Sequence, residues 1–165
     1  MKFNLLFVLL ITTLGFVGCS GDDEECNLMV NIPTSFNQTV FQDNIATIEN
    51  YLSANGLTAQ KTASGLYYII NEEGSLAKPE LCDDVSVAYR GYLVNGTTFD
   101  SSNGEPITFP LTGVIFGWQE GIQLFGKEGN GVLLIPSYLA YGNSSPSPLI
   151  PGNSALIFDV TLDNF

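Results

Sequence analysis

The sequence predicts an α+β domain in which an antiparallel β-sheet half wraps a short helix, with one amphipathic helix ahead of it. Between residues 66 and 165, short runs of alternating apolar and polar residues are typical of half-buried strands. An earlier segment, residues 41–52, repeats its apolar residues every three or four positions, which is typical of a helix. The 17 Gly and 8 Pro favour a turn-rich sheet over a helical bundle.

Length and composition exclude several classes of protein. The 165 residues allow one ordinary domain with an appendage, and 45% hydrophobic against 13% charged residues supply an apolar core. A formal net charge of −12 opposes binding to nucleic-acid phosphates. The absence of histidine from the sequence removes Ser-His-Asp triads, Cys-His pairs and the common zinc sites. We therefore expect a chemistry without metal or cofactor, and partners that do not include nucleic acid.

Residues 1–18 have the pattern of a secretory signal peptide. Lys2 precedes an apolar run from Leu5 to Leu14, which is too short for a membrane-spanning helix. The segment ends in Phe16–Cys19, which resembles a bacterial lipobox with Phe in place of the usual Leu. That resemblance implies cleavage before Cys19 and lipidation of its thiol. The alternative is an ordinary secretory signal.

Residues 19–36 are expected to form an acidic lipoprotein tether. Four adjacent carboxylates in Ser20–Glu25 repel one another and extend the chain. This run also resembles the acidic tract that directs some lipoproteins to the bacterial surface. We expect a lipid-anchored protein of the cell envelope, on the periplasmic or the outer face of the outer membrane. Outside the cytoplasm, Cys26 and Cys82 either pair or remain free thiols, and the sequence leaves both open.

Residues 37–63 are expected to hold the amphipathic helix. Thr39–Gln42 has the form of a capping box, and Asn55-Gly56 has the form of a glycine C-cap. The apolar stripe consists of Phe41, Ile45, Ile48 and Leu52. The stripe either lies on the domain that follows or serves as a dimerisation arm.

The strands are predicted by alternation and by their turns. Asn95-Gly96 is a hairpin signal that places residues 97–100 antiparallel to the strand before it. Prolines bracket Ile107–Phe109, which suits a sheet edge, and a short helical piece is expected between Gly113 and Gly126. The other expected strands are Leu66–Ile70, Val85–Leu93, Val132–Ile135 and Ala155–Phe165.

Five segments in order resemble the FKBP family of peptidyl-prolyl isomerases. They are Val87–Leu93 with Gly96, Phe99–Ser102, Val114–Gly121, Ile135-Pro136 with Leu139–Gly142, and Ile150-Pro151 with Leu156–Val160. The resemblance covers residues 64–165 and implies a curved antiparallel sheet around a short helix, with an apolar pocket between them.

The resemblance also implies the site residues. The expected catalytic residues are Asp100, Tyr89, Phe99 and Tyr141, and the expected substrate-binding residues are Val114, Ile115, Trp118, Ile150, Phe158 and Ile107. Trp118 would form the floor. The N–H of Ile115 and the hydroxyl of Tyr141 would bind peptide carbonyl groups, and Asp100 would lie at the rim near Tyr89.

The sequence departs from the family in the same region. The loop Asn103–Glu105 is short and lacks the arginine with which many members hold the aspartate, so Asp100 is expected to be less fixed. Ile107 stands where many members carry a pocket-facing phenylalanine.

The function implied by the resemblance is that of a foldase for exported proteins. It would isomerise X-Pro bonds by stabilising a twisted amide in the apolar pocket. The expected partners are proline-containing unfolded or partly folded polypeptides, with macrolide ligands of the family as further binders. The alternative is a non-catalytic chaperone or protein-binding module with the same fold.

Overall fold

The computed structural model describes residue 26 and residues 28–165, so the predictions for the signal peptide and for lipidation at Cys19 lie outside the described residues. The helices are α1 (Gln38–Ala54) and α2 (Phe116–Gly121), and the strands are β1 (Gln60–Lys61), β2 (Tyr67–Glu72), β3 (Asp84–Leu93), β4 (Thr98–Ser101), β5 (Ile107–Pro110), β6 (Asn130–Ile135) and β7 (Leu156–Asn164). Within these residues, no helix combines the length and the apolar character needed to cross a bilayer.

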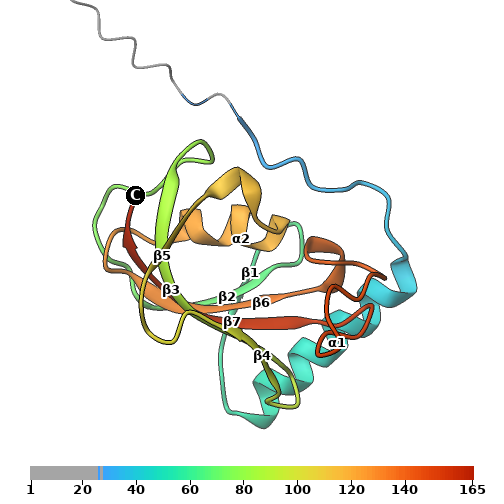
Figure 1. Cartoon of the computed structure of the whole chain (residues 1–165). Helices are drawn as coiled ribbons and strands as arrows, with labels where there is room; N and C mark the ends of the chain where they lie inside the picture. Colours follow the sequence, from blue (N-terminus) through green and yellow to red (C-terminus); the bar gives the residue numbers. More distant parts are fainter. Residues whose placement is uncertain (1–25, 27) are drawn as a thin grey trace, which may run out of the picture.

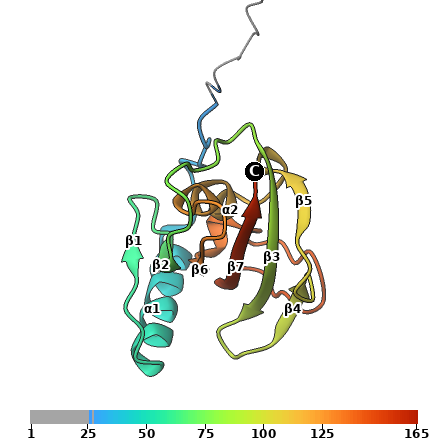
Figure 2. The same cartoon turned by 90° about the vertical axis from the view of Figure 1, so that its left-hand side faces the viewer.

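The seven strands form one antiparallel sheet. Its order is β1-β2-β6-β7-β3-β4, and β5 pairs with β3 on the same edge as β4. The loop 102–106 separates β4 from β5, so two short strands share the length of β3. Figure 2 shows the sheet from the side, with β4 and β5 at one end and β1 at the other. The predicted hairpin and the predicted edge strand are both confirmed.

The concave face of the sheet wraps α2, as the fold class predicts (Figure 1). Leu156, Phe158, Val160 and Leu162 of β7 all face this core, which confirms their alternation. The helix lies close to β6 because its two glycines face that strand. A Cβ atom on Gly117 would lie 2.4 Å from Ile135, and one on Gly121 would lie 2.7 Å from Leu133. Small residues at both positions therefore set the width of the space beside α2.

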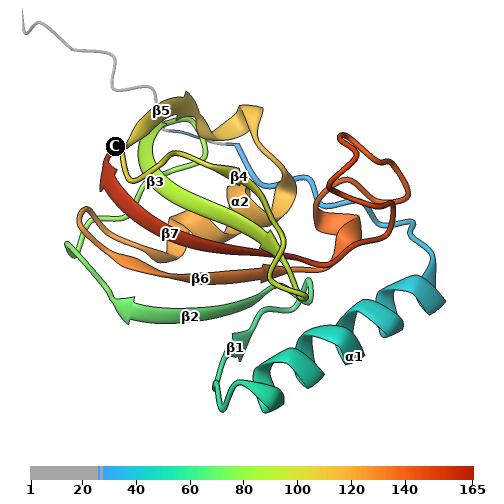
Figure 3. The ribbon, with the colours of Figure 1, turned by 60° about the horizontal axis from the view of Figure 1, so that its bottom comes forward.

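The amphipathic helix α1 covers the other face of the sheet (Figure 3). Ile45, Ile48 and Leu52 are buried in a second apolar cluster with side chains of β2, β6 and β7. The prediction that the stripe lies on its own domain is therefore confirmed. The expected Thr39 cap is wrong, because the N-cap is Asn37, two residues earlier, whose side chain accepts the N–H of Val40. The helix ends at Ala54 with Asn55 as its C-cap, and Gly56 follows with a positive φ of 64°, as predicted.

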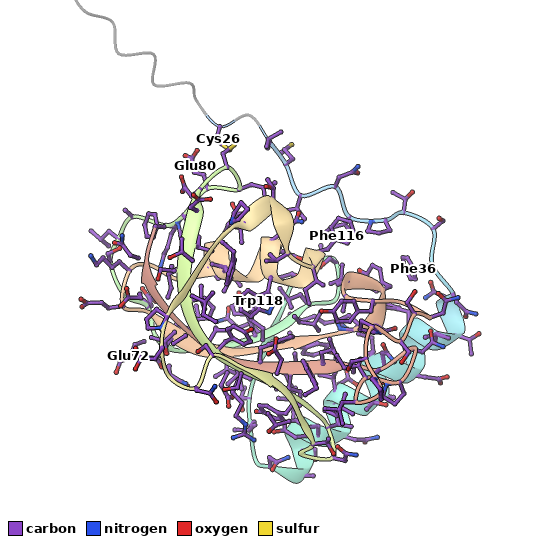
Figure 4. The ribbon with its side chains drawn as sticks, in the orientation of Figure 1. Cys26, Phe36, Glu72, Glu80, Phe116 and Trp118 are labelled. Atoms are coloured by element: carbon purple, nitrogen blue, oxygen red, sulfur yellow. A yellow bond between two sulfur atoms is a disulfide. The ribbon has the colours of Figure 1, made fainter. Side chains whose placement is uncertain are left out.

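Cys26 and Cys82 form a disulfide, with their Cα atoms 5.9 Å apart. The bond fixes the start of the described chain to the segment just before β3 (Figure 4). From there the chain passes along the molecule, where Val30 and Ile32 pack against the core that contains α2. Part of the segment that the sequence predicts to be a tether thus contributes apolar contacts to the domain.

Candidate functional site

A cleft of about 560 Å³ opens between the concave face of the sheet and the N-terminal end of α2. Four parts of the fold supply its lining: the strands β3, β4, β5 and β7, the entry to α2, the helix itself, and the loop between β6 and β7. The lining residues are Tyr89, Phe99, Asp100, Phe109, Gly113, Val114, Ile115, Trp118, Tyr141, Pro146, Ser147, Ile150 and Phe158. Nine of the ten expected site residues within the described chain are among them.

The floor of the cleft is Trp118, which lies between α2 and the sheet (Figure 4). Its side chain is only 4% exposed. Tyr89 and Phe158 meet the indole edge to face, with ring centroids 5.2 and 5.3 Å away, and Phe109 lies at 5.5 Å. Such contacts stabilise aromatic clusters beyond the burial of area alone. The indole Nε1 is buried and has no hydrogen-bond partner among the described residues.

One wall of the cleft consists of strand residues and is called the sheet wall here: Tyr89 of β3, Phe99 of β4 and Phe158 of β7. Phe99 and Phe158 are in edge-to-face contact at 5.5 Å. They meet over Gly91, where a Cβ atom would lie 2.5 Å from Phe99 and 2.7 Å from Phe158. The absence of a side chain at this position of β3 therefore lets the two rings form the wall.

Asp100 lies exposed at the rim of the cleft and is held by two donors. The hydroxyl of Tyr89 donates to Oδ2 and the N–H of Ser101 donates to Oδ1, both at 2.8 Å. The buried Ser102 fixes this segment in turn, because its Oγ accepts the Tyr89 N–H and its own N–H donates to the Tyr89 carbonyl. Strand and turn donors hold the carboxylate where the arginine is missing.

The environment of the rim keeps its phenols neutral. Burial raises the pKa of Tyr89 to about 12, and the hydrogen bond to Asp100 and its negative charge add to the effect. Burial also raises the pKa of Tyr141, with a further contribution from the charge of Asp100. Both hydroxyl groups therefore remain hydrogen-bond donors throughout the physiological range.

The opposite wall, called the loop wall here, consists of Tyr141, Pro146, Ser147 and Ile150 from the loop between β6 and β7. The loop turns tightly at Ser147, whose carbonyl accepts the N–H of Ile150. The hydroxyl of Ser145 contacts the carbonyl groups of both residues, at 3.0 and 2.8 Å. Val114 and Ile115 close the end of the cleft, where Ile115 is the N-cap of α2.

Ile107 is the one expected binding residue that the structure does not place in the cleft. It is the first residue of the edge strand β5, which pairs only with β3, and its side chain is 44% exposed. Phe109, two residues further along the same face, lines the cleft instead. Sequence reasoning missed Phe109, although its period-two spacing from Ile107 is a signal that could have found it. It also missed Gly113, Pro146 and Ser147.

The family model described as FKBP-type peptidyl-prolyl cis-trans isomerase matches residues 76–163. FkpA of Aeromonas hydrophila, a protein of that description, is 47% identical over 118 residues, covering 69% of this chain and 44% of the relative. The peptidyl-prolyl cis-trans isomerase Mip of Coxiella burnetii is 44% identical over 102 residues, covering 61% of this chain and 44% of the relative.

Among solved structures, the crystal structure of FkpA from Escherichia coli matches with a TM-score of 0.66 and 39% identity, covering 76% of this chain and 61% of that one. The chain spans less than half the length of the two curated relatives. The match to the family model includes more than half of the chain and both walls of the cleft. The chain therefore belongs to the family of FKBP-type peptidyl-prolyl cis-trans isomerases.

Proposed function

We propose that this chain catalyses the cis-trans isomerisation of X-Pro peptide bonds in the cleft above Trp118. The observation that carries the proposal is the composition of the cleft, in which aromatic and aliphatic side chains surround one rim carboxylate with a defined orientation. Membership of the family supports the same reaction.

The chemistry needs no proton transfer and no covalent intermediate. Conjugation of the amide nitrogen with the carbonyl opposes rotation with a barrier of about 18 to 20 kcal/mol. In the transition state the amide is twisted and its C–N bond is less dipolar, so an apolar cleft stabilises it relative to the planar ground state. The proline ring would lie on Trp118, where flat aromatic walls bury it on several sides.

Polar groups at the edge of the cleft would orient the peptide. The N–H of Ile115 and the hydroxyl of Tyr141 are proposed to donate to peptide carbonyl groups. Asp100, held by Tyr89, would act on the carbonyl next to the rotating bond through its charge and its hydrogen bonds. Phe99 would contact the proline ring from the sheet wall.

An isomerisation assay on X-Pro tetrapeptides tests the proposal. We expect acceleration by the wild type and a loss of both turnover and peptide binding in Phe99→Ala. Leu76→Ala is the matched control, since Leu76 is 99% exposed and lies outside the cleft. Folded wild type without acceleration on any such peptide would refute the proposal. Peptide binding without acceleration would favour the non-catalytic binding module.

We also propose that the protein acts on exported, proline-containing polypeptides from a lipid anchor in the cell envelope, in the outer membrane. The disulfide supports an oxidising compartment, because such bonds persist outside the cytoplasm. Replacing Cys19 by Ala should release the protein from the membrane fraction. Retained membrane association with acylation intact would contradict the anchor.

Macrolide ligands of the family are proposed to occupy the same cleft. A macrolide should then inhibit the wild type competitively with the tetrapeptide, and Phe99→Ala should weaken inhibition. Inhibition that is not competitive, or binding that Phe99→Ala leaves unchanged, would place the ligand elsewhere.

A further inference from the structure

The base of the loop between β6 and β7 is closed by a ring of four hydrogen bonds, called the loop ring here. Asn44 Oδ1 accepts the N–H of Ser137 at 2.6 Å, and Asn44 Nδ2 donates to the carbonyl of Asn153 at 3.0 Å. The N–H of Asn153 donates to Gly142, and the N–H of Gly142 donates to Ser137, both at 2.7 Å. Three members contribute backbone groups, so Asn44 supplies the only side chain in the ring.

Asn44 belongs to a different part of the chain from the other members. It lies on α1, ahead of the residues that match the family model, whereas the loop lies within them. Its side chain is 6% exposed, and Ser137 is 3% exposed. A buried polar group without a partner costs free energy, so the ring satisfies groups on both sides of the contact. Figure 3 shows the loop beside the start of α1.

The backbone at the base of the loop needs this support. Gly142 and Asn153 both have a positive φ, 59° and 62°. The left-handed region is less favourable for Asn than for Gly, although Asn adopts it more readily than most residues, so the contacts of Asn153 help to hold its conformation. Without Asn44, only one bond of the loop ring, the donation from the Asn153 N–H to Gly142, would still hold Asn153 in this conformation.

The loop ring adjoins the loop wall of the cleft. Tyr141 directly precedes Gly142, and Ile150 lies three residues before Asn153. We propose that Asn44 is a positioning residue that holds the loop wall, so that the helix outside the family match forms part of the cleft's support. The effect on catalysis rests on the proposed function, whereas the effect on the loop does not.

Attachment of α1 to the sheet is a separate matter. Ile45, Ile48 and Leu52 bury the apolar stripe of the helix without taking part in the loop ring. A substitution at Asn44 that spares this stripe should leave the helix in place. The two roles are therefore separable by experiment.

Asn44→Asp is the sharpest test because its effect depends on protonation. A neutral carboxyl can accept from Ser137 and donate to Asn153, as the amide does, whereas an ionised one repels the Asn153 carbonyl. Burial raises the pKa of the new carboxyl, since it penalises the charged form. Asn50→Asp is the matched control, because Asn50 is exposed on the same helix. Amide hydrogen exchange of the loop and tetrapeptide isomerisation by NMR exchange spectroscopy are measured at about pH 5 and about pH 8.

At about pH 8, we expect the loop amides of Asn44→Asp to exchange at least about fivefold faster than those of Asn50→Asp, with kcat/KM reduced by a similar factor. At about pH 5, both differences should shrink to within about twofold. Equal behaviour of the two variants at both pH values would overturn the inference.

A second variant guards against general unfolding. Asn44→Ser has too short a side chain to span from Ser137 to Asn153, and it carries no charge. It should speed exchange at Gly142 and Asn153 while leaving the amides of β7 unchanged. Equal acceleration throughout the domain would overturn the inference. If the wild type shows no isomerase activity, the proposed function fails, and the exchange data still decide whether Asn44 holds the loop.

Discussion

The two walls of the cleft are built by different means. Tyr89, Phe99 and Phe158 of the sheet wall lie on strands whose backbone is paired along most of its length, and Phe158 is 5% exposed within the main core. The loop wall lies on a connection without regular pairing, and Tyr141 is 39% exposed. Local backbone bonds and a few side-chain bonds, including those from Ser145 and Asn44, hold its conformation.

This difference indicates which residues contribute both to the free energy of unfolding and to peptide binding. A change in the sheet wall alters the core and the cleft together, because the same rings serve both. On the loop wall, a change at the exposed Tyr141 should alter the cleft with little effect on the core, whereas Ile150 of the same wall is 6% exposed and belongs to the core. Variants on the two sides should therefore separate the free energy of unfolding from peptide affinity.

The largest effect is expected for Phe158→Ala. Removing this ring leaves a cavity beside Trp118 and should lower the free energy of unfolding by about 3 to 5 kcal/mol, with loss of peptide binding. Urea unfolding followed by circular dichroism measures it. A loss below about 1 kcal/mol would show that the sheet wall is not part of the core.

On the loop wall, Tyr141→Ala should weaken peptide binding and turnover together, by about tenfold, while the free energy of unfolding changes by less than about 0.5 kcal/mol. Isothermal titration calorimetry with a proline peptide measures the affinity, and urea unfolding measures the free energy of unfolding. A large loss of stability with unchanged affinity would reverse the comparison between the walls.

At the rim, Asp100→Asn should keep the fold and lower kcat/KM by about tenfold, which corresponds to about 1.4 kcal/mol of transition-state stabilisation. The amide keeps one oxygen as an acceptor but loses the charge. The tetrapeptide assay measures this change, and an unchanged thermal unfolding midpoint is the control. Wild-type activity in this variant would remove the carboxylate from the mechanism.

A much smaller effect is expected for Ile107→Ala, which should change kcat/KM by less than about twofold, because the side chain lies outside the lining. Phe109→Ala is the matched comparison on the same strand face and should be clearly impaired. Equal losses in the two variants would place Ile107 in the substrate path.

The smallest effect is expected when the pH is changed. Activity should stay nearly constant between about pH 6 and pH 9, because the pKa of Tyr89 is raised to about 12 and its hydroxyl keeps its proton there. Because the pKa of Tyr89 is higher in the folded than in the unfolded protein, its contribution to the free energy of unfolding is fully present below the unfolded-state pKa. That contribution is lost as the pH rises through the folded-state pKa. Stability and activity should therefore fall together only in strong alkali. A bell-shaped profile near neutrality would contradict the mechanism.

Much of the sheet wall could be predicted from the sequence, because apolar and polar residues alternate along a strand that is buried on one face. The run from Leu156 to Leu162 shows which side chains face the core, and the Asn95-Gly96 turn sets the hairpin. The resemblance to the family placed Phe99 and Trp118 in the expected cleft, where the structure also has them. Regular structure thus made the larger part of the cleft predictable.

The rest depends on contacts between distant parts of the chain, which no local pattern reveals. The bonds from Asn44 to Ser137 and Asn153 join residues 93 and 109 positions apart. The contact between Asp100 and Tyr89 was expected from the family resemblance, whereas the bond that Asp100 accepts from the N–H of Ser101 was not. The cap at Asn37 was missed because Thr39 offers an equally plausible pattern two residues later.

Trp118 is the only tryptophan in the sequence. All indole fluorescence of the protein therefore originates at the floor of the cleft, among the rings of Tyr89, Phe109 and Phe158. Because the indole is 4% exposed and its N–H has no partner among the described residues, its emission should be blue-shifted in the free protein. The molecule thus carries an intrinsic optical reporter at the place where a peptide would bind.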